Sequence, residues 1–129
     1  MYLRLGEGAY CGHMHVKGIH HVSINVENLA EAMAFYVDKL GFEALPRPDF
    51  SFPGAWLATG GQQVHLLELP GEARNKTQHW AFEVDDLDLA LAELDAAGVP
   101  YRKAEGRTQA FLKDPSGNMI EVQQPMPAA

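Results

Sequence analysis

The chain has 129 residues, of which 47% are hydrophobic and 21% are charged, and its formal net charge is −7. This length suits a single domain with its own core, and no apolar stretch approaches the roughly 20 residues that span a bilayer. The excess of negative charge offers no basic surface to a phosphate backbone, so we expect neither a membrane protein nor a nucleic-acid-binding protein.

The first 16 residues show no periodic pattern. They lack the long apolar core and the small-residue cleavage site of a secretory signal, so we interpret residues 1–16 as an extension or a tag. The domain itself is expected over residues 17–125. Cys11 is the only cysteine, which excludes an internal disulfide framework and an all-thiolate zinc site. A cytoplasmic protein fits these features best.

The first expected element of the domain is an alternating strand that begins at His21. Its apolar side chains share one face: Val22, Ile24 and Val26. Its polar side chains share the other face: His21, Ser23 and Asn25. An amphipathic helix follows, with Asn28 as its N-cap, Glu31 three residues later in a capping-box pattern, and Gly41 at its end. The apolar strand face should pack on this helix and leave the histidine face open.

Three short strands are expected after the helix. They cover Phe42–Pro46, Ala55–Thr59 and Gln62–Leu69. Gly60-Gly61 is a strong hairpin turn between the last two strands. The first half of the chain therefore follows the order βαβββ.

The second half repeats this order. The segment HWAFEVDDLDLALAE from His79 matches HVSINVENLAEAMAF from His21, 58 residues earlier. Asp86 caps the second helix and Gly98 ends it. The remaining strands are expected over Val99–Lys103, Gln109–Lys113 and Asn118–Gln123, with a turn at Asp114–Gly117.

The repeat predicts two βαβββ modules, at about residues 17–70 and 76–125. Neither module covers both faces of its own sheet, so the two should combine. We expect an α+β fold in which a curved, eight-stranded mixed sheet carries the helices on its outside. The hollow on the inner side of the sheet would hold a ligand.

Four polar residues fall on the inner face of this expected sheet. Aligning the two final hairpins pairs His65 with Glu121, just as the repeat pairs His21 with His79. Three imidazoles and one carboxylate suit a divalent metal ion such as Zn, Ni, Fe, Co or Mn, with positions left open for substrate. His65 would either bind the metal or contact the substrate from the same wall.

Three stretches carry a family resemblance: GIHHVSINVENLAEAMAFYVDKLGF, QHWAFEVDDLDLALAELDAAGVPY and FLKDPSGNMIEVQQP. Together they resemble the vicinal oxygen chelate superfamily, which includes glyoxalases, bleomycin and fosfomycin resistance proteins and extradiol dioxygenases. The resemblance covers about residues 17 to 125 and implies a divalent metal held by His21, His79 and Glu121. Glyoxalase-like members take a fourth ligand, usually glutamate or glutamine, from the position that His65 occupies here.

The resemblance implies a glyoxalase-like lyase or isomerase. A small substrate with adjacent oxygens would chelate the metal, which would stabilise the enolate formed when Glu121, His65 or a water molecule removes a proton. A non-heme iron dioxygenase of the extradiol type needs only two histidines and one carboxylate and is one alternative. A drug-binding or antibiotic-resistance protein that needs no metal is the other.

Substrate contacts are expected from the loop over Arg47–Gly54 and from the strand that follows it. Phe50, Phe52 and Trp56 would either close over an apolar or aromatic ligand or complete the core. Four further residues offer hydrogen bonds: Ser23, Asn25, Gln63 and Arg107. The exposed edges of a two-module sheet also suggest a homodimer.

Overall fold

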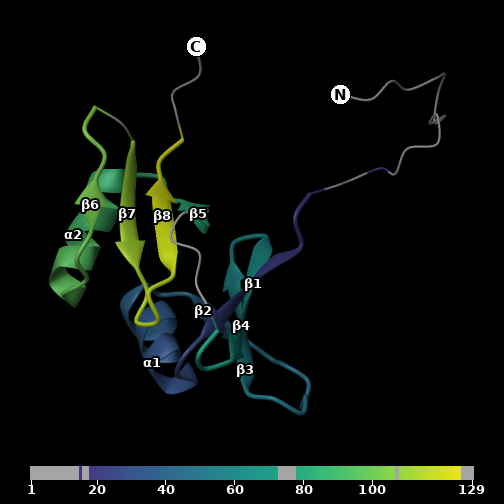
Figure 1. Ribbon diagram of the computed structural model, residues 1–129. Helices are drawn as coiled ribbons and strands as arrows, with labels where there is room; N and C mark the ends of the chain where they lie inside the picture. The colour runs from purple at the N-terminus through teal and green to yellow at the C-terminus, as the bar shows by residue number, and fades with distance from the viewer. Residues whose placement is uncertain (1–14, 16–17, 73–77, 107, 126–129) are drawn as a thin grey trace, which may run out of the picture.

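The computed structural model describes residue 15 and residues 18–72, 78–106 and 108–125. They form two modules of like construction (Figure 1). The strands of the first module are β1 (His21–Val26), β2 (Glu43–Leu45), β3 (Gly54–Thr59) and β4 (Gln62–Glu68). Those of the second are β5 (His79–Glu83), β6 (Arg102–Lys103), β7 (Gln109–Lys113) and β8 (Met119–Gln123). The α+β class and the duplicated βαβββ order are therefore confirmed.

One helical segment follows the first strand of each module. In the first module α1 (Leu29–Met33) continues directly into a π-helical segment, η1 (Ala34–Lys39), and in the second α2 (Leu87–Ala97) is regular. The predicted N-caps are confirmed, since the Asn28 side chain accepts a hydrogen bond from the Glu31 backbone N–H and Asp86 accepts one from that of Leu89.

Each helix also receives a cap from the end of its module's last strand. Oε2 of Glu68 accepts a hydrogen bond from the Leu29 backbone N–H at 2.8 Å. Oε1 of Gln124 accepts the corresponding bond from Leu87 at 2.8 Å. These contacts satisfy helix N–H groups that lack a partner within the helix. The repeat therefore extends to the side chains that join each helix to its sheet.

The eight strands form two hydrogen-bonded sheets of four. Their orders are β1-β4-β3-β2 and β5-β8-β7-β6, and the first pair in each sheet is parallel while the other pairs are antiparallel. The continuous eight-stranded hydrogen bonding expected from the sequence is thus divided between the modules. In the described part of the chain, β1 and β5 are edge strands.

The modules meet through a turn and a helix. The β7–β8 turn lies beside the first-module helix (Figure 1). Three hydrogen bonds join it to the first module: Tyr36 Oη to Asp114 Oδ2 at 2.8 Å, Asn118 Nδ2 to Asn25 O at 2.9 Å, and Glu27 N to Ser116 Oγ at 2.8 Å. Tyr36 is 0% exposed and Asp114 is 4% exposed. A buried, charge-assisted hydrogen bond therefore helps to fix how the modules sit together.

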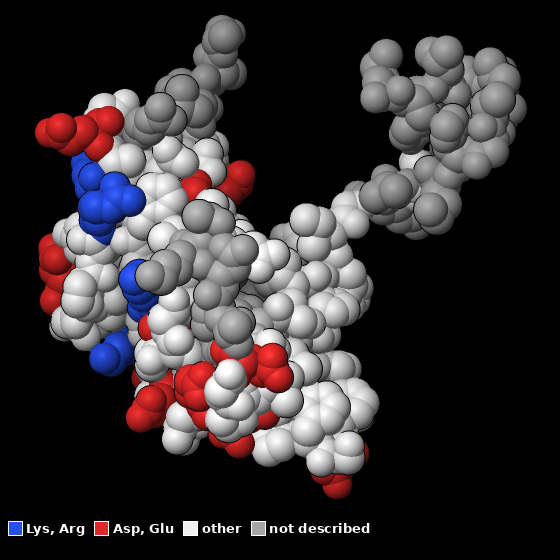
Figure 2. All heavy atoms as spheres, in the orientation of Figure 1, with Lys and Arg blue, Asp and Glu red and all other residues white. Residues whose placement is uncertain are grey.

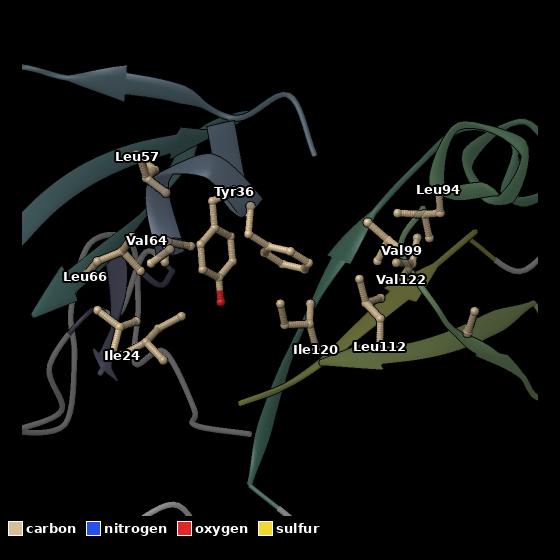
Figure 3. Packing of buried hydrophobic residues seen from close by; sticks show 14 of the residues in the cluster. Ile24, Tyr36, Leu57, Val64, Leu66, Leu94, Val99, Leu112, Ile120 and Val122 are labelled. Carbon is tan, nitrogen blue, oxygen red and sulfur yellow. The ribbon is translucent and has the colours of Figure 1, made fainter. Parts of the chain in front are cut away.

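One hydrophobic cluster runs through both modules. Figure 3 shows Tyr36 between two groups of core residues. The first-module group contains Ile24, Leu57, Val64 and Leu66, and the second-module group contains Leu94, Val99, Leu112, Ile120 and Val122. The apolar strand faces predicted from the alternating pattern are the faces that pack here.

The surface shows no concentration of positive charge on the face drawn in Figure 2. Lys and Arg side chains lie among Asp and Glu on the second-module side of this face, whereas Asp and Glu side chains gather over the lower part of the first module. Within the described ranges, none of the helices has the length and hydropathy of a membrane span.

Candidate functional site

The strand register places equivalent residues of the two modules in equivalent rows across the sheets. The first-module row reads Ser23, His65 and Trp56, on β1, β4 and β3. The second-module row reads Ala81, Glu121 and Phe111, on β5, β8 and β7. His65 and Glu121 therefore occupy corresponding positions, and alternation puts both on the sheet face opposite the buried valines and leucines.

The first-module histidines form a stacked pair. The rings of His21 and His65 lie 3.9 Å apart between centroids, with 13° between their planes. Nε2 of His65 lies 2.8 Å from Oε1 of Gln63. Because an amide oxygen only accepts, Nε2 donates and the Nδ1 lone pair of His65 stays available. His20, which the alternation assigns to the other face, touches His21 through an Nδ1–Nδ1 contact of 2.9 Å.

The environment of His65 favours its neutral form. Burial is the main cause that lowers the pKa of His65, and positive charge on His21, His20 and Arg47 lowers it further. A neutral imidazole keeps a lone pair near neutral pH. His65 is therefore suited to bind a metal or accept a proton.

The second-module pair consists of an acid and an imidazole. Glu121 is 7% exposed, and its Oε1 lies 3.2 Å from Nε2 of His79. Its Oε2 accepts a hydrogen bond from Nε2 of Gln109 at 2.9 Å. A buried carboxylate is costly unless its oxygens have partners, and here both have one.

The separation within this pair fits adjacent metal ligands. Two atoms bound to one tetrahedral zinc at 2.0–2.1 Å lie about 3.3 Å apart. His79 Nε2 and Glu121 Oε1 have nearly this spacing, and the His79 side chain is 37% exposed. The pair could therefore bind an ion from its open side.

The structure brings the four predicted ligands together as two pairs and not as one cluster. His21 and His65 belong to the first module, and His79 and Glu121 belong to the second. Over residues 18–72, 78–106 and 108–125, no three His, Cys, Asp or Glu side chains lie close enough to hold a metal ion. Two donors make half of a four-coordinate shell, so each pair is a half-site by number, but only His79 and Glu121 have the spacing of adjacent ligands, since the His21 and His65 rings are stacked.

A cleft of about 1200 Å³ lies where the first-module sheet meets β5. Its lining includes Val22, Phe42, Val64, His79, Trp80 and Phe82. Val22 and Val64 belong to the helix-facing side of the first sheet, opposite the face of His65. Of the four predicted ligands, only His79 borders this cleft, so it differs from the polar hollow expected from the sequence.

The aromatic residues predicted to contact substrate lie beside His65. The Trp56 ring stacks on His65 with centroids 4.6 Å apart. Phe50 and Phe52 are 43% and 39% exposed, so they do not complete the core. Phe50 lies 6.1 Å from the Trp56 ring. An exposed aromatic wall therefore leads from the β2–β3 loop to the first-module histidines.

The predicted hydrogen-bonding residues have different surroundings. Ser23 is exposed and is the register partner of His65. Asn25 lies at the module junction, where its backbone oxygen accepts a hydrogen bond from Asn118. Arg107 lies outside the described residues, as does the predicted extension over 1–16 apart from residue 15.

Two residues near the candidate site were not predicted from the sequence: Gln109, the partner of Glu121, and Arg47. Gln109 lies two residues before Phe111 on β7, so the period of two would have placed it on the ligand face. Arg47 lies in an irregular loop, where no period assigns it to a face.

Comparisons with known proteins identify the family of the chain. The family model for the Glyoxalase/Bleomycin resistance protein/Dioxygenase superfamily matches residues 18–122. "Glyoxylase I 4" of Arabidopsis thaliana is 32% identical over 124 residues, which cover 84% of this chain and 71% of that protein. "Metallothiol transferase FosB" of Shouchella clausii is 30% identical over 122 residues, which cover 83% and 80%. A glyoxalase family protein from Bacillus anthracis has a crystal structure that matches with a TM-score of 0.81 at 28% identity, covering 88% of this chain and 99% of that one. The chain therefore belongs to the glyoxalase/bleomycin resistance protein/dioxygenase superfamily.

Proposed function

We propose that this protein is a divalent-metal-dependent lyase or isomerase of the glyoxalase type, acting on a small substrate with adjacent oxygen atoms. The observation that carries this proposal is the His79–Glu121 pair. Its carboxylate is buried, faces an imidazole nitrogen at 3.2 Å, and is held from behind by Gln109. The similarity to "Glyoxylase I 4" supports the reaction class. The similarity to a "Metallothiol transferase" supports the use of a metal.

The ligand set that we propose is His21, His79 and Glu121, with His65 as a fourth ligand or as a substrate contact. Nitrogen and oxygen donors of this kind suit Zn, Ni, Fe, Co or Mn. When bound, such an ion polarises a carbonyl and lowers the cost of negative charge beside it.

We propose that a second copy of the chain completes each site in a homodimer. The buried bond between Tyr36 and Asp114 supports a fixed arrangement of the two modules within one chain. A full metal shell needs both half-sites, so the histidine pair of one copy would face the His79–Glu121 pair of another. In the described part of the chain, β1 and β5 lie at sheet edges, where a strand of a partner can add.

Two residues are candidates for moving the substrate proton. A carboxylate bound to a cation is a weak base, so Glu121 serves best when it is not coordinated. His65 keeps its Nδ1 lone pair while Nε2 donates to Gln63. Its lowered pKa keeps that lone pair free at neutral pH. Ser23, beside His65, would orient a substrate oxygen.

Elemental analysis of protein purified without a chelating tag tests this function. We expect about one metal ion per chain, with loss of that ion in His79→Ala and Glu121→Gln. Glu93→Gln, which changes an exposed acid on α2, is the matched control and should keep the ion. Wild-type protein without stoichiometric metal after reconstitution would contradict the proposal. Retention of metal in His65→Ala would assign His65 to substrate contact.

An extradiol-type dioxygenase is the second candidate. The hydrogen bond from His65 to Gln63 favours it, because His65 would then stay outside a set of two histidines and one carboxylate. Oxygen uptake with ferrous iron and a catechol separates the two reactions, since only the oxygenase consumes dioxygen.

A drug-binding or resistance protein of the same fold is the third reading, and the exposed aromatic wall is what favours it. Such a protein would bind its ligand equally well without metal. Normal substrate turnover only in the metal-loaded form would contradict this reading.

A further inference from the structure

Five rings form a continuous series across the first module. In order from the β2–β3 loop they are Phe52, Phe50, Trp56, His65 and His21. Neighbouring centroids lie 5.9, 6.1, 4.6 and 3.9 Å apart, and three of the four contacts are nearly parallel, with interplanar angles of 11°, 12° and 13°. Parallel rings with exposed apolar surface at one end offer a platform on which another planar ring can stack.

Arg47 is held in place at the outer end of this series. Its guanidinium carbon lies 4.7 Å from the Phe50 centroid and 5.1 Å from that of Phe52. Its Nη2 donates a hydrogen bond to the Phe52 backbone oxygen at 3.1 Å. Gly54 leaves room beneath it, because a Cβ there would lie 2.9 Å from Nη2. The guanidinium is therefore ordered before any ligand arrives.

In the part of the chain that the structure describes, the charge of Arg47 has no carboxylate partner. Across the described ranges, no Asp or Glu lies within ion-pair distance of Arg47, although the chain has 17 acidic and 10 basic residues. The residue is half-buried, and within the described residues one of its N–H donors is engaged, by the Phe52 backbone oxygen. A guanidinium presents a planar fork of donors that matches a carboxylate, so its remaining donors favour an anionic group from a ligand.

We infer that the proposed site takes an aromatic carboxylate, with the ring stacked on the wall of Phe50, Phe52 and Trp56 and the carboxylate bound by Arg47. The substrate class follows from the rings and the unpaired cation together, and the inference rests on the proposed function. Binding in this way directs the rest of the substrate along the series toward His65 and His21.

Benzoylformate is a suitable probe because it combines a phenyl ring, a carboxylate and an adjacent keto oxygen. Methyl benzoylformate lacks the charge, and pyruvate lacks the ring. The chain has two tryptophans, so in a Trp80→Phe background the fluorescence reports on Trp56. Binding is measured on metal-free protein, and calorimetric titration of the wild-type chain repeats the comparison without the Trp80 substitution.

Benzoylformate should bind at least about tenfold more tightly than either of the other probes. The ester loses the charge-assisted hydrogen bond, and pyruvate loses the stacked ring. Arg47→Met keeps the aliphatic stem against the phenyl rings and should remove about tenfold of this affinity, with no effect on the ester. Lys39→Met removes an exposed cation from η1 and should leave all three affinities unchanged.

Equal affinity for the acid and the ester would overturn the inference. So would an Arg47→Met chain that unfolds more easily yet keeps the preference for the acid, because Arg47 would then only brace the loop. If the protein binds no metal but still selects benzoylformate through Arg47, the proposed reaction fails and the subsite stands. If it binds metal without this selection, the subsite alone fails.

Discussion

Replacing Tyr36 with Phe removes one hydroxyl from the junction of the two modules. That hydroxyl donates to Asp114 Oδ2 at 2.8 Å in a buried setting. A hydrogen bond to a charged acceptor contributes about 1.5–3 kcal/mol net. The Asp114 carboxylate keeps three donors, from the backbone N–H groups of Ser116 and Asn118 and from Asn118 Nδ2. We therefore expect a loss within this range and below the roughly 3–5 kcal/mol that an unpaired buried charge costs.

Urea unfolding of the wild type and of Tyr36→Phe measures this loss as a shift of the midpoint at constant slope. Tyr101→Phe is the matched control. Its hydroxyl also donates to an aspartate, Asp95, at 3.2 Å, but this pair is exposed, so the midpoint should hardly change. If Tyr36→Phe behaves like Tyr101→Phe, the buried bond does not hold the modules together and the reasoning is refuted.

Three further predictions concern the pH dependence of stability, the hydrogen bond from Gln109 to Glu121, and the close packing at Gly54. Burial raises the pKa of the Tyr36 hydroxyl above its usual 10.0, and the neighbouring Asp114 carboxylate raises it further. The folded protein therefore holds this proton more tightly than the unfolded chain does. The stability that results is present below that pH and is lost as the pH rises above it. Unfolding between about pH 9 and pH 11 should lose stability more steeply in the wild type than in Tyr36→Phe, and equal slopes would contradict this. Gln109→Leu removes the donor that orients Glu121 and should lower metal affinity about 10–100-fold in a calorimetric titration, whereas unchanged affinity would exclude an orienting role. Gly54→Ala drives a Cβ into the backbone oxygen of Leu66 on β4 and should cost about 1–3 kcal/mol in urea unfolding. Gly61→Ala is the control, because a Cβ at Gly61 has no heavy atom within 4 Å. Equal unfolding midpoints for the two variants would show that β3 and β4 can move apart at Gly54 without loss of stability.

Alternation along the strands was enough to predict which residues share a face. His65 and Glu121 are equivalent in the register because each follows a hairpin turn by the same number of residues. The helix caps Asn28 and Asp86 were also predictable, since an N-cap is a local feature. The predictions that succeeded therefore depend on short-range pattern.

The arrangement of the modules depends on contacts that no short-range pattern encodes. Tyr36 fits the apolar stripe of its helix, and nothing near it in the sequence indicates that its hydroxyl meets Asp114, 78 residues away. Alternation assigns side chains to faces but does not say which strand edges meet. For this reason the sequence predicted one continuous sheet, whereas the hydrogen bonds form two sheets of four.

In the proposed dimer each metal site takes ligands from two copies of the chain, and complementation of metal binding between two inactive variants tests this arrangement. His21→Ala and Glu121→Gln should each lose the ion when expressed alone. In a co-expressed mixture, half of the randomly formed dimers are heterodimers, and each heterodimer has one site with all of its ligands, so about a quarter of the wild-type metal should return. Native mass spectrometry identifies the heterodimer and its metal. Heterodimers that form but carry no metal would contradict the claim.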